Sequence, residues 1–269
     1  MNKLTDRCCG VIKVITLLIL YLARGLASGQ DQVAASEPFD YAKIPLFTGT
    51  VYAIGSDRTN ILFTFRRTAT RSGSTVHVDR LFNTPDGRVA AQEHVLYESG
   101  NMVSFEMNNP QAGLWGTMKI VADPDHAGQQ KLIINHGSGT GDRGKGVTRD
   151  LPKDLLTDDS IYPFILIHWD ELMQGATLKF SMVAFERDRA FNFTLRKTTG
   201  LKPVAGQPTV WLKMTAANVI VARFVNPIYF GIEQAAPHRV LEYIGRTAPM
   251  TKKGNSWKYL DAETVFDWK

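Results

Sequence analysis

The chain has 269 residues, and its 31 lysines and arginines against 26 acidic residues give a formal net charge of +5 at pH 7. Residues 1–27 hold four basic side chains and one acidic one, a net of +3, so the rest of the chain carries only +2. So small an excess does not support a nucleic-acid-binding or anionic-membrane-binding surface. Both cysteines, Cys8 and Cys9, also precede residue 28. Disulfides and sulfur-based zinc sites are therefore excluded for residues 28–269.

The first residues have the pattern of a bacterial export signal. Lys3, Arg7 and Lys13 precede an apolar run at 14–23, and small residues follow that run. The run is about half the length that a membrane-spanning helix needs, as in a secretory signal peptide. We expect residues 1–27 to be a signal peptide, 28–45 a flexible leader and 46–269 one β-rich domain, periplasmic or secreted, with no membrane span after cleavage.

Short alternating runs between turn residues dominate the expected domain. They predict strands at 47–54, 60–66, 75–82, 89–97, 102–107, 114–122, 131–135, 177–185, 190–196, 209–214, 219–224, 229–233 and 239–244. One helix is predicted at 160–173, where apolar residues recur three and four positions apart. The absence of β-α-β alternation favours an antiparallel sheet, and curling removes its edges. We predict a mainly β fold: a large antiparallel sheet curled into a half-open barrel around one central helix.

The pair Asp86-Gly87 between two alternating runs is typical of a hairpin turn. Aligning Thr84 with Val89 places Phe82 opposite Ala91 and, further along, Val78 opposite Val95 and Val76 opposite Tyr97. The same register pairs Arg80 with Glu93 on that face. This matching of side-chain types predicts the register, because a one-residue slip would reverse both faces.

The same register places Asp79 opposite His94, with His77 diagonal to His94. A carboxylate beside an imidazole can orient it as a base, and two histidines can bind zinc or copper, although no third ligand is evident. Ser138 follows His136-Gly137, where a hydrolase nucleophile turn needs glycine two residues before the serine. The loop at 139–145 resembles a phosphate loop, but Gly146 replaces the required Ser or Thr.

The many aromatic residues indicate a possible binding site, since a curved sheet can leave an interior hollow for an apolar ligand. The predicted ligand-binding residues are Phe63, Phe65, Phe164, His168 and Trp169, and we expect Asp158 and Asp159 to cap the helix. An interior hollow would support binding, and a solid interior would contradict it.

The functional prediction is non-catalytic binding of an apolar or amphipathic ligand, such as a lipid, or of an envelope protein. We expect no nucleic-acid partner, cofactor or metal. Two alternatives stay open: a hydrolase that uses Ser138 or the Asp79–His94 pair, and an assembly protein that acts through an exposed sheet edge.

The segment Asp150–Phe164, DLPKDLLTDDSIYPF, resembles a family of uncharacterised exported bacterial proteins in which such a segment opens a central helix between two blocks of strands. That family is similar in turn to the open β-barrel lipoprotein carriers of the periplasm, the LolA- and LolB-like group. The resemblance implies a curved sheet around an apolar hollow, and it brings no catalytic residues.

Overall fold

Fifteen strands lie side by side in one sheet in the computed structural model, which describes residues 39–139, 144, 146–223 and 225–268. The expected signal peptide at 1–27 and residues 28–38 of the expected leader lie outside the described residues. Residues Tyr41–Lys43 form a short 3-10 helix, η1, and Ile44 after it is buried.

The strands match the predicted runs closely in the first half of the chain. Their bounds are β1 (Phe47–Ala53), β2 (Ile61–Ser72), β3 (Thr75–Asn83), β4 (Val89–Glu98), β5 (Asn101–Asn109), β6 (Leu114–Ala122), β7 (Gln130–Ser138), β8 (Val147–Asp150), β9 (Leu155–Leu156), β10 (Thr177–Ala184), β11 (Arg189–Thr198), β12 (Thr209–Ala216), β13 (Ile228–Glu233), β14 (Val240–Lys253) and β15 (Ser256–Trp268). The strands β8, β9 and β15 were not predicted. Residues 219–222, predicted as a strand, form the short helix α4 (Val219–Ala222) instead.

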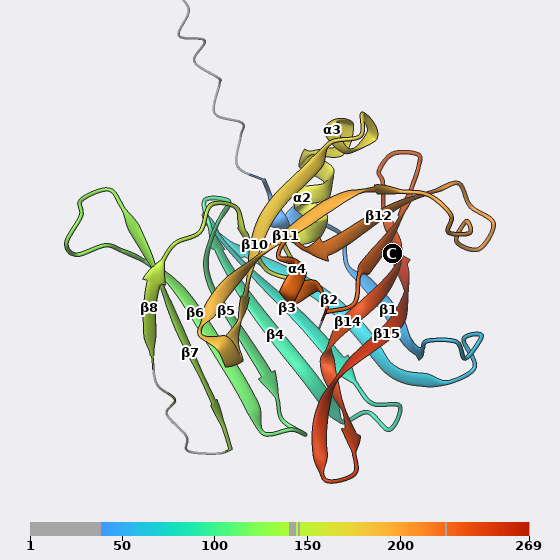
Figure 1. Cartoon of the computed structure of the whole chain (residues 1–269), viewed down its shortest axis with the longest axis horizontal. Coiled ribbons are helices and arrows are strands. Elements are labelled where there is room, and N and C mark those ends of the chain that lie inside the picture. Colours follow the sequence, from blue (N-terminus) through green and yellow to red (C-terminus); the bar gives the residue numbers. More distant parts are fainter. Residues whose placement is uncertain (1–38, 140–143, 145, 224, 269) are drawn as a thin grey trace, which may run out of the picture. The chain divides into compact units, whose positions relative to one another are not determined.

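Each strand pairs with its neighbour in sequence except at one place, between β8 and β9. The first strand, β1, pairs with the last, β15, so the order runs β8-β7-β6-β5-β4-β3-β2-β1-β15-β14-β13-β12-β11-β10-β9. The two ends of this order, β8 and β9, are consecutive in the chain and are separated by residues 151–154. All pairs are antiparallel except β9 with β10. The mainly β, unclosed curled sheet that we predicted is thus confirmed (Figure 1).

The two edge strands of the sheet, β8 and β9, do not pair with each other, and side chains close the seam between them. After β10 the chain forms a second 3-10 helix, η2 (Phe185–Arg187), and Phe185 stacks on Phe105 of β5 with ring centroids 5.8 Å apart. Gly116 of β6 makes room for this ring, because a Cβ at Gly116 would lie 2.5 Å from it. His136 of β7 pairs with Asp188 at 3.1 Å. The segment that follows β10, with Phe185 and Asp188, therefore packs against β5, β6 and β7.

The predicted helix consists of two short helices, α2 (Ile161–Ile167) and α3 (Trp169–Met173), which meet at His168. The helical hydrogen bonds continue across the junction, from His168 N to Phe164 O and from Leu172 N to His168 O. The junction is therefore a kink rather than a separation. Buried side chains of α2 and α3 pack against β10–β14, beside which Figure 1 shows both helices. The outer side of α2 reaches solvent, where Ile167 is 55% exposed.

The hairpin β3–β4 has the predicted register along most of its length. Asp79 faces His94, Arg80 faces Glu93, and Val78 faces Val95. At the turn the register shifts by one residue, so that Val89 faces Asn83 rather than Thr84. The bulge follows from the turn, where Thr84 N donates to Arg88 O at 2.8 Å.

Candidate functional site

A cavity of about 70 Å³ lies inside the curled sheet, next to the first turn of α2. Part of its wall is apolar: Ile44, Phe47, Phe65, Phe82, Ile161, Phe230, Val240, Ala248 and Phe266. The rest is polar: Arg67, Arg80, Asp158, Asp159, Tyr162, Tyr243, Arg246, Thr247 and Thr264. A water molecule needs about 10–15 Å³ and a drug-sized ligand about 300 Å³ or more, so the cavity fits a small group.

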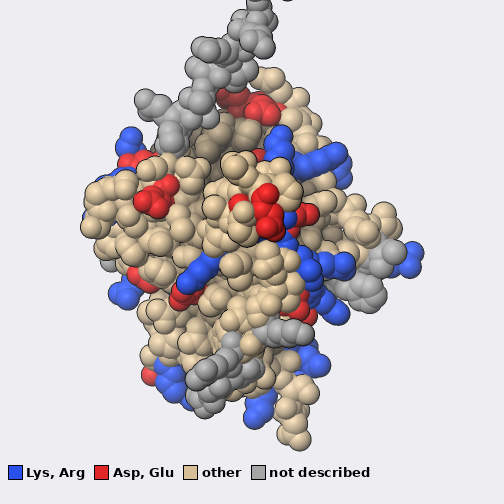
Figure 2. Space-filling model, turned by 90° about the vertical axis from the view of Figure 1, so that its left-hand side faces the viewer, with Lys and Arg blue, Asp and Glu red and all other residues tan. Residues whose placement is uncertain are grey.

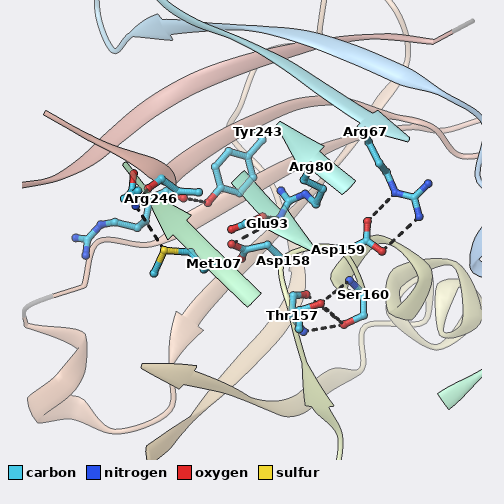
Figure 3. Close-up of polar contacts among 12 residues, drawn as sticks. Arg67, Arg80, Glu93, Met107, Thr157, Asp158, Asp159, Ser160, Tyr243 and Arg246 are labelled. Carbon is cyan, nitrogen blue, oxygen red and sulfur yellow. Dashed lines mark hydrogen bonds and ion pairs between the residues drawn. The ribbon is translucent and has the colours of Figure 1, made fainter. Parts of the chain in front are cut away.

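The innermost polar feature is a buried ion pair between Arg67 of β2 and Asp159, two residues before α2. Arg67 donates from Nε to Asp159 Oδ1 at 2.6 Å and from Nη2 to Oδ2 at 3.3 Å, and both side chains are at most 2% exposed. Tyr97 donates its hydroxyl to Asp159 Oδ2 at 3.0 Å. The Arg67 guanidinium also donates to the backbone oxygens of Tyr41 and Ile44. This pair holds the segment just before α2 against β2 (Figure 3).

Asp159 reaches Arg67 because Thr157 and Ser160, on either side of it, form the turn before α2. Thr157 N donates to Ser160 Oγ at 2.8 Å, and Ser160 N donates back to Thr157 O at 3.1 Å. These bonds close the turn before α2, whose N-cap residue Ser160 makes no side-chain capping hydrogen bond. The prediction that Asp158 and Asp159 cap the helix is therefore wrong. Their carboxylates point into the cavity wall instead.

A second buried ion pair joins Arg80 of β3 to Glu93 of β4, directly across the hairpin. Glu93 is 2% exposed, and burial together with the nearby carboxylates of Asp158 and Asp159 raises the pKa of Glu93 to about 8 despite the charge of Arg80. Asp158 Oδ2 lies 3.8 Å from Arg80 Nη1, too far for a hydrogen bond. The Asp158 side chain is 41% exposed, so this side of the cluster reaches the surface.

The strand β14 completes the polar wall with Tyr243 and Arg246. Arg246 Nε donates to Asp261 Oδ1 of β15 at 2.8 Å. Tyr243 donates its hydroxyl to the backbone oxygen of Arg246, and burial, with a contribution from the Asp158 carboxylate, raises the pKa of Tyr243. All three lining arginines thus face carboxylates, and the tyrosine stays a neutral donor.

The predicted ligand-binding residues do not gather at one place. Both Phe63 and Phe65 pack in the core formed by β1–β4 and β15, but only Phe65 lines the cavity. Phe164 packs against Phe180 with ring centroids 5.6 Å apart. His168 pairs with Glu171 at 2.7 Å on the helix surface.

Trp169 lines a different site, a cleft on the surface of the protein. It stacks on His238, with ring centroids 4.0 Å apart, and lines a wide cleft of about 490 Å³ beside β11 and β12. Trp211 also lines this cleft, and its Nε1 donates to Lys202 O at 2.9 Å. Of the five predicted residues, only Phe65 therefore lines the interior cavity.

The candidate hydrolase residues lie on separate strands. His94 Nδ1 contacts Asp79 Oδ1 at 2.9 Å, as the register predicts. Ser138 lies on β7, which β5 and β6 separate from β4. Three strand spacings amount to about 14 Å, so Ser138 is outside hydrogen-bond reach of His94. Ser138 and the Asp79–His94 pair do not form one site.

Metal and membrane features are sparse in the part of the chain that the structure describes. There, no three His, Asp or Glu side chains converge on one point that could hold a metal ion. The described helices are also too short or too polar to cross a membrane. The glycine-rich loop lies partly outside the described residues, at 140–143 and 145.

Most of the cavity's polar residues were missed by the sequence reasoning. Only the Arg80–Glu93 pair followed from the hairpin register. Arg67 had a signal that could have revealed it, because it continues the inward-facing series of Phe63 and Phe65 on β2. An arginine at an inward position of an alternating strand indicates a buried charge that needs a partner.

Comparison with known proteins finds a likeness to a solved structure. No known protein family matches the chain, and no curated protein sequence matches it. Among solved structures, a β-barrel-like protein of a domain of unknown function, DUF1849, from Brucella abortus is similar over 84% of this chain and 96% of its own, with 7% identity and a TM-score of 0.37. The resemblance of residues 150–164 to a family of uncharacterised exported proteins, and of that family to the lipoprotein carriers, stays a prediction.

Proposed function

We propose that the protein is exported to the bacterial cell envelope and binds an amphipathic ligand inside its half-open barrel without catalysing a reaction. The observation that carries this proposal is the composition of the cavity wall. Five phenylalanines form one part of the wall, and the ion pairs of Arg67, Arg80 and Arg246 form another. An apolar group of the ligand would contact the phenylalanines, and its polar group would face the arginines.

Arg80 is the best contact for an anionic head group. Its partner Asp158 is partly exposed and 3.8 Å away, too far for a hydrogen bond to Arg80, so a carboxylate or phosphate could take the place of Asp158 beside Arg80. Burial raises the pKa of Glu93, so this partner of Arg80 carries its negative charge less readily than an exposed carboxylate does. By contrast, the guanidinium of Arg67 already forms an ion pair with Asp159 and donates to two backbone oxygens.

The size of the cavity limits the ligand or requires the barrel to widen. About 70 Å³ has room for a short apolar group but not for a lipid chain. The sheet could widen at the seam between β8 and β9, which do not pair with each other in the described structure. The seam is closed by side chains such as Phe185, and their contacts can break without breaking strand pairs.

The assembly alternative has less support from the sheet edges. The edge strand β8 carries Arg149 and Asp150, and Asp150 pairs with Lys131 at 2.7 Å. Charged residues on an edge strand oppose pairing with another chain. Figure 2 shows basic and acidic side chains interspersed on the side of the molecule that carries this edge.

The test uses a fluorescent fatty acid with a dansyl group, which combines an apolar chain with a carboxylate. We expect the protein to bind it with increased fluorescence, and Ala248→Phe, which fills part of the cavity, to weaken binding at least tenfold. Ala127→Phe, in an exposed turn, serves as the matched control and should bind as the wild type does. Native mass spectrometry of the protein from the cell envelope should show a small bound molecule.

Two results would overturn the proposal. One is the absence of both probe binding and a co-purified small molecule. The other is equal binding by the wild type and Ala248→Phe, since the probe would then sit outside the cavity. Circular dichroism of each variant verifies that the sheet is intact.

A further inference from the structure

The outer face of the β3–β4 hairpin carries a pair of histidines whose geometry suits a metal ion. His77 and His94 are diagonal neighbours on this face, and Asp79 lies directly opposite His94. The Nδ1 atom of His77 lies 3.5 Å from the Nε2 atom of His94. On the other side of the ring, His94 Nδ1 lies 2.9 Å from Asp79 Oδ1. This face is opposite to the cavity, so the pair takes no part in the proposed ligand site.

Asp79 decides which nitrogen of His94 is available. Because a carboxylate accepts hydrogen bonds, Nδ1 of His94 carries the proton and donates it to Asp79. The neutral ring then has its lone pair on Nε2, directed at His77 Nδ1. Histidine ligands of metal ions are commonly oriented in this way by a carboxylate on the far nitrogen.

The separation of the two nitrogens agrees with tetrahedral zinc. Zinc–nitrogen bonds of about 2.0–2.1 Å at a tetrahedral angle place two ligand nitrogens about 3.3–3.4 Å apart. The observed 3.5 Å is close to that value. A square-planar ion with bonds of this length would need about 2.9 Å. The geometry therefore favours zinc over square-planar copper.

Neighbouring groups leave room for the ion and add negative charge. The side chains of His94 and Asp79 are 33% and 48% exposed, so the site is open to solvent. Glu106 of β5 faces His94 directly across the sheet and is exposed, and both residues line the same surface cleft. Its carboxylate adds negative charge beside the two histidines, and water can complete the coordination.

We propose that His77 Nδ1 and His94 Nε2 bind a zinc ion on the outer face of β3 and β4. Asp79 is a positioning residue that holds the His94 ring with Nε2 outward. With two histidine ligands the site would be weaker than closed structural zinc sites, which have four protein ligands. It is independent of the proposed ligand cavity.

Isothermal titration of the tag-free protein with zinc sulfate at pH 7.5 tests the site. We expect one zinc ion per chain, at least tenfold weaker binding for His77→Gln and for His94→Gln, and about tenfold weaker binding for Asp79→Asn. His126→Gln is the matched control, because His126 also faces a carboxylate, Asp123 at 3.0 Å, on an exposed turn. It should bind zinc as the wild type does.

X-ray absorption of the zinc-loaded wild type gives a readout that does not depend on any variant folding. We expect two imidazole nitrogens at about 2.0 Å from the ion and oxygen in the remaining positions. Absence of zinc binding, sulfur ligands in the spectrum, or unchanged affinity in both His77→Gln and His94→Gln would overturn the proposal. If zinc does not bind, the two rings form only an imidazole–imidazole hydrogen bond.

Discussion

The buried pair of Arg67 and Asp159 allows a quantitative test of what joins the helix to the sheet. In Asp159→Asn the guanidinium keeps its two backbone acceptors but loses its counter-charge, in a site where both side chains are at most 2% exposed. Removing one partner of a buried pair costs about 3–5 kcal/mol, because the remaining charge stays desolvated. With a urea m-value of about 3 kcal/mol/M, the unfolding midpoint should fall by roughly 1–1.7 M.

Urea unfolding followed by tryptophan fluorescence and circular dichroism measures this loss. The double variant Arg67→Met with Asp159→Leu should regain most of it, because apolar residues in place of a buried pair are about neutral. The control Arg88→Met breaks an exposed pair with Asp86, whose side chains are 74% and 57% exposed, and should leave the midpoint nearly unchanged. A loss below about 1 kcal/mol in Asp159→Asn, or a double variant no more stable than the single one, would refute the reasoning.

Three further perturbations test the cavity wall, the seam and the closing strand. Because burial raises the pKa of Glu93 from an ordinary 4.5 to about 8, the folded state holds its proton more tightly than the unfolded state. The protonated carboxyl group of Glu93 therefore stabilises the folded state fully below about pH 4.5. This stabilisation is lost as the pH rises to about 8, at about 1.4 kcal/mol per pKa unit. Urea midpoints between pH 5 and pH 9 should therefore fall more steeply in the wild type than in Glu93→Gln, and equal slopes would contradict this. Gly116→Ala should cost about 1–3 kcal/mol, since the new Cβ meets the Phe185 ring, and adding Phe185→Leu should recover part of the loss of melting temperature. Trp268→Phe removes the 2.6 Å bond from Nε1 to Val240 O and should cost about 1 kcal/mol in urea unfolding, whereas an unchanged midpoint would show that the bond adds no stability.

Local pairing was predictable from the sequence, because a hairpin joins residues that are close in the chain. The register of β3 with β4 followed from matching side-chain types, and only the residues at the bulge differed. The strand β15 was missed because it lacks a strong apolar face: of its residues, only Ala262 and Thr264 are buried. The helix α4 was missed because three β-branched residues are typical of a strand, whereas Asn218 begins a helical turn, its Oδ1 accepting from Val221 N at 3.4 Å.

The cavity was less predictable, because its charged residues meet only in the folded chain. Arg67 and Asp159 are 92 positions apart, and no local pattern connects them. Asp159 also follows Thr157 in a segment whose composition suits a helix start, so capping was the simpler interpretation. The decisive fact is that Thr157 and Ser160 bond each other in the turn before α2 and leave Asp159 to pair with Arg67.

The hairpin β3–β4 connects the two proposals through one register. Successive residues of a strand point to opposite faces, so Arg80 and Glu93 face the cavity while their neighbours Asp79 and His94 face outward. A shift of one residue would bury the imidazole and expose the arginine pair. A zinc ion bound by His77 and His94 would therefore stabilise the register that holds Arg80 in the cavity wall. Since a ligand of the native state adds stability according to its free concentration, zinc should raise the melting temperature of the wild type but not of His94→Gln.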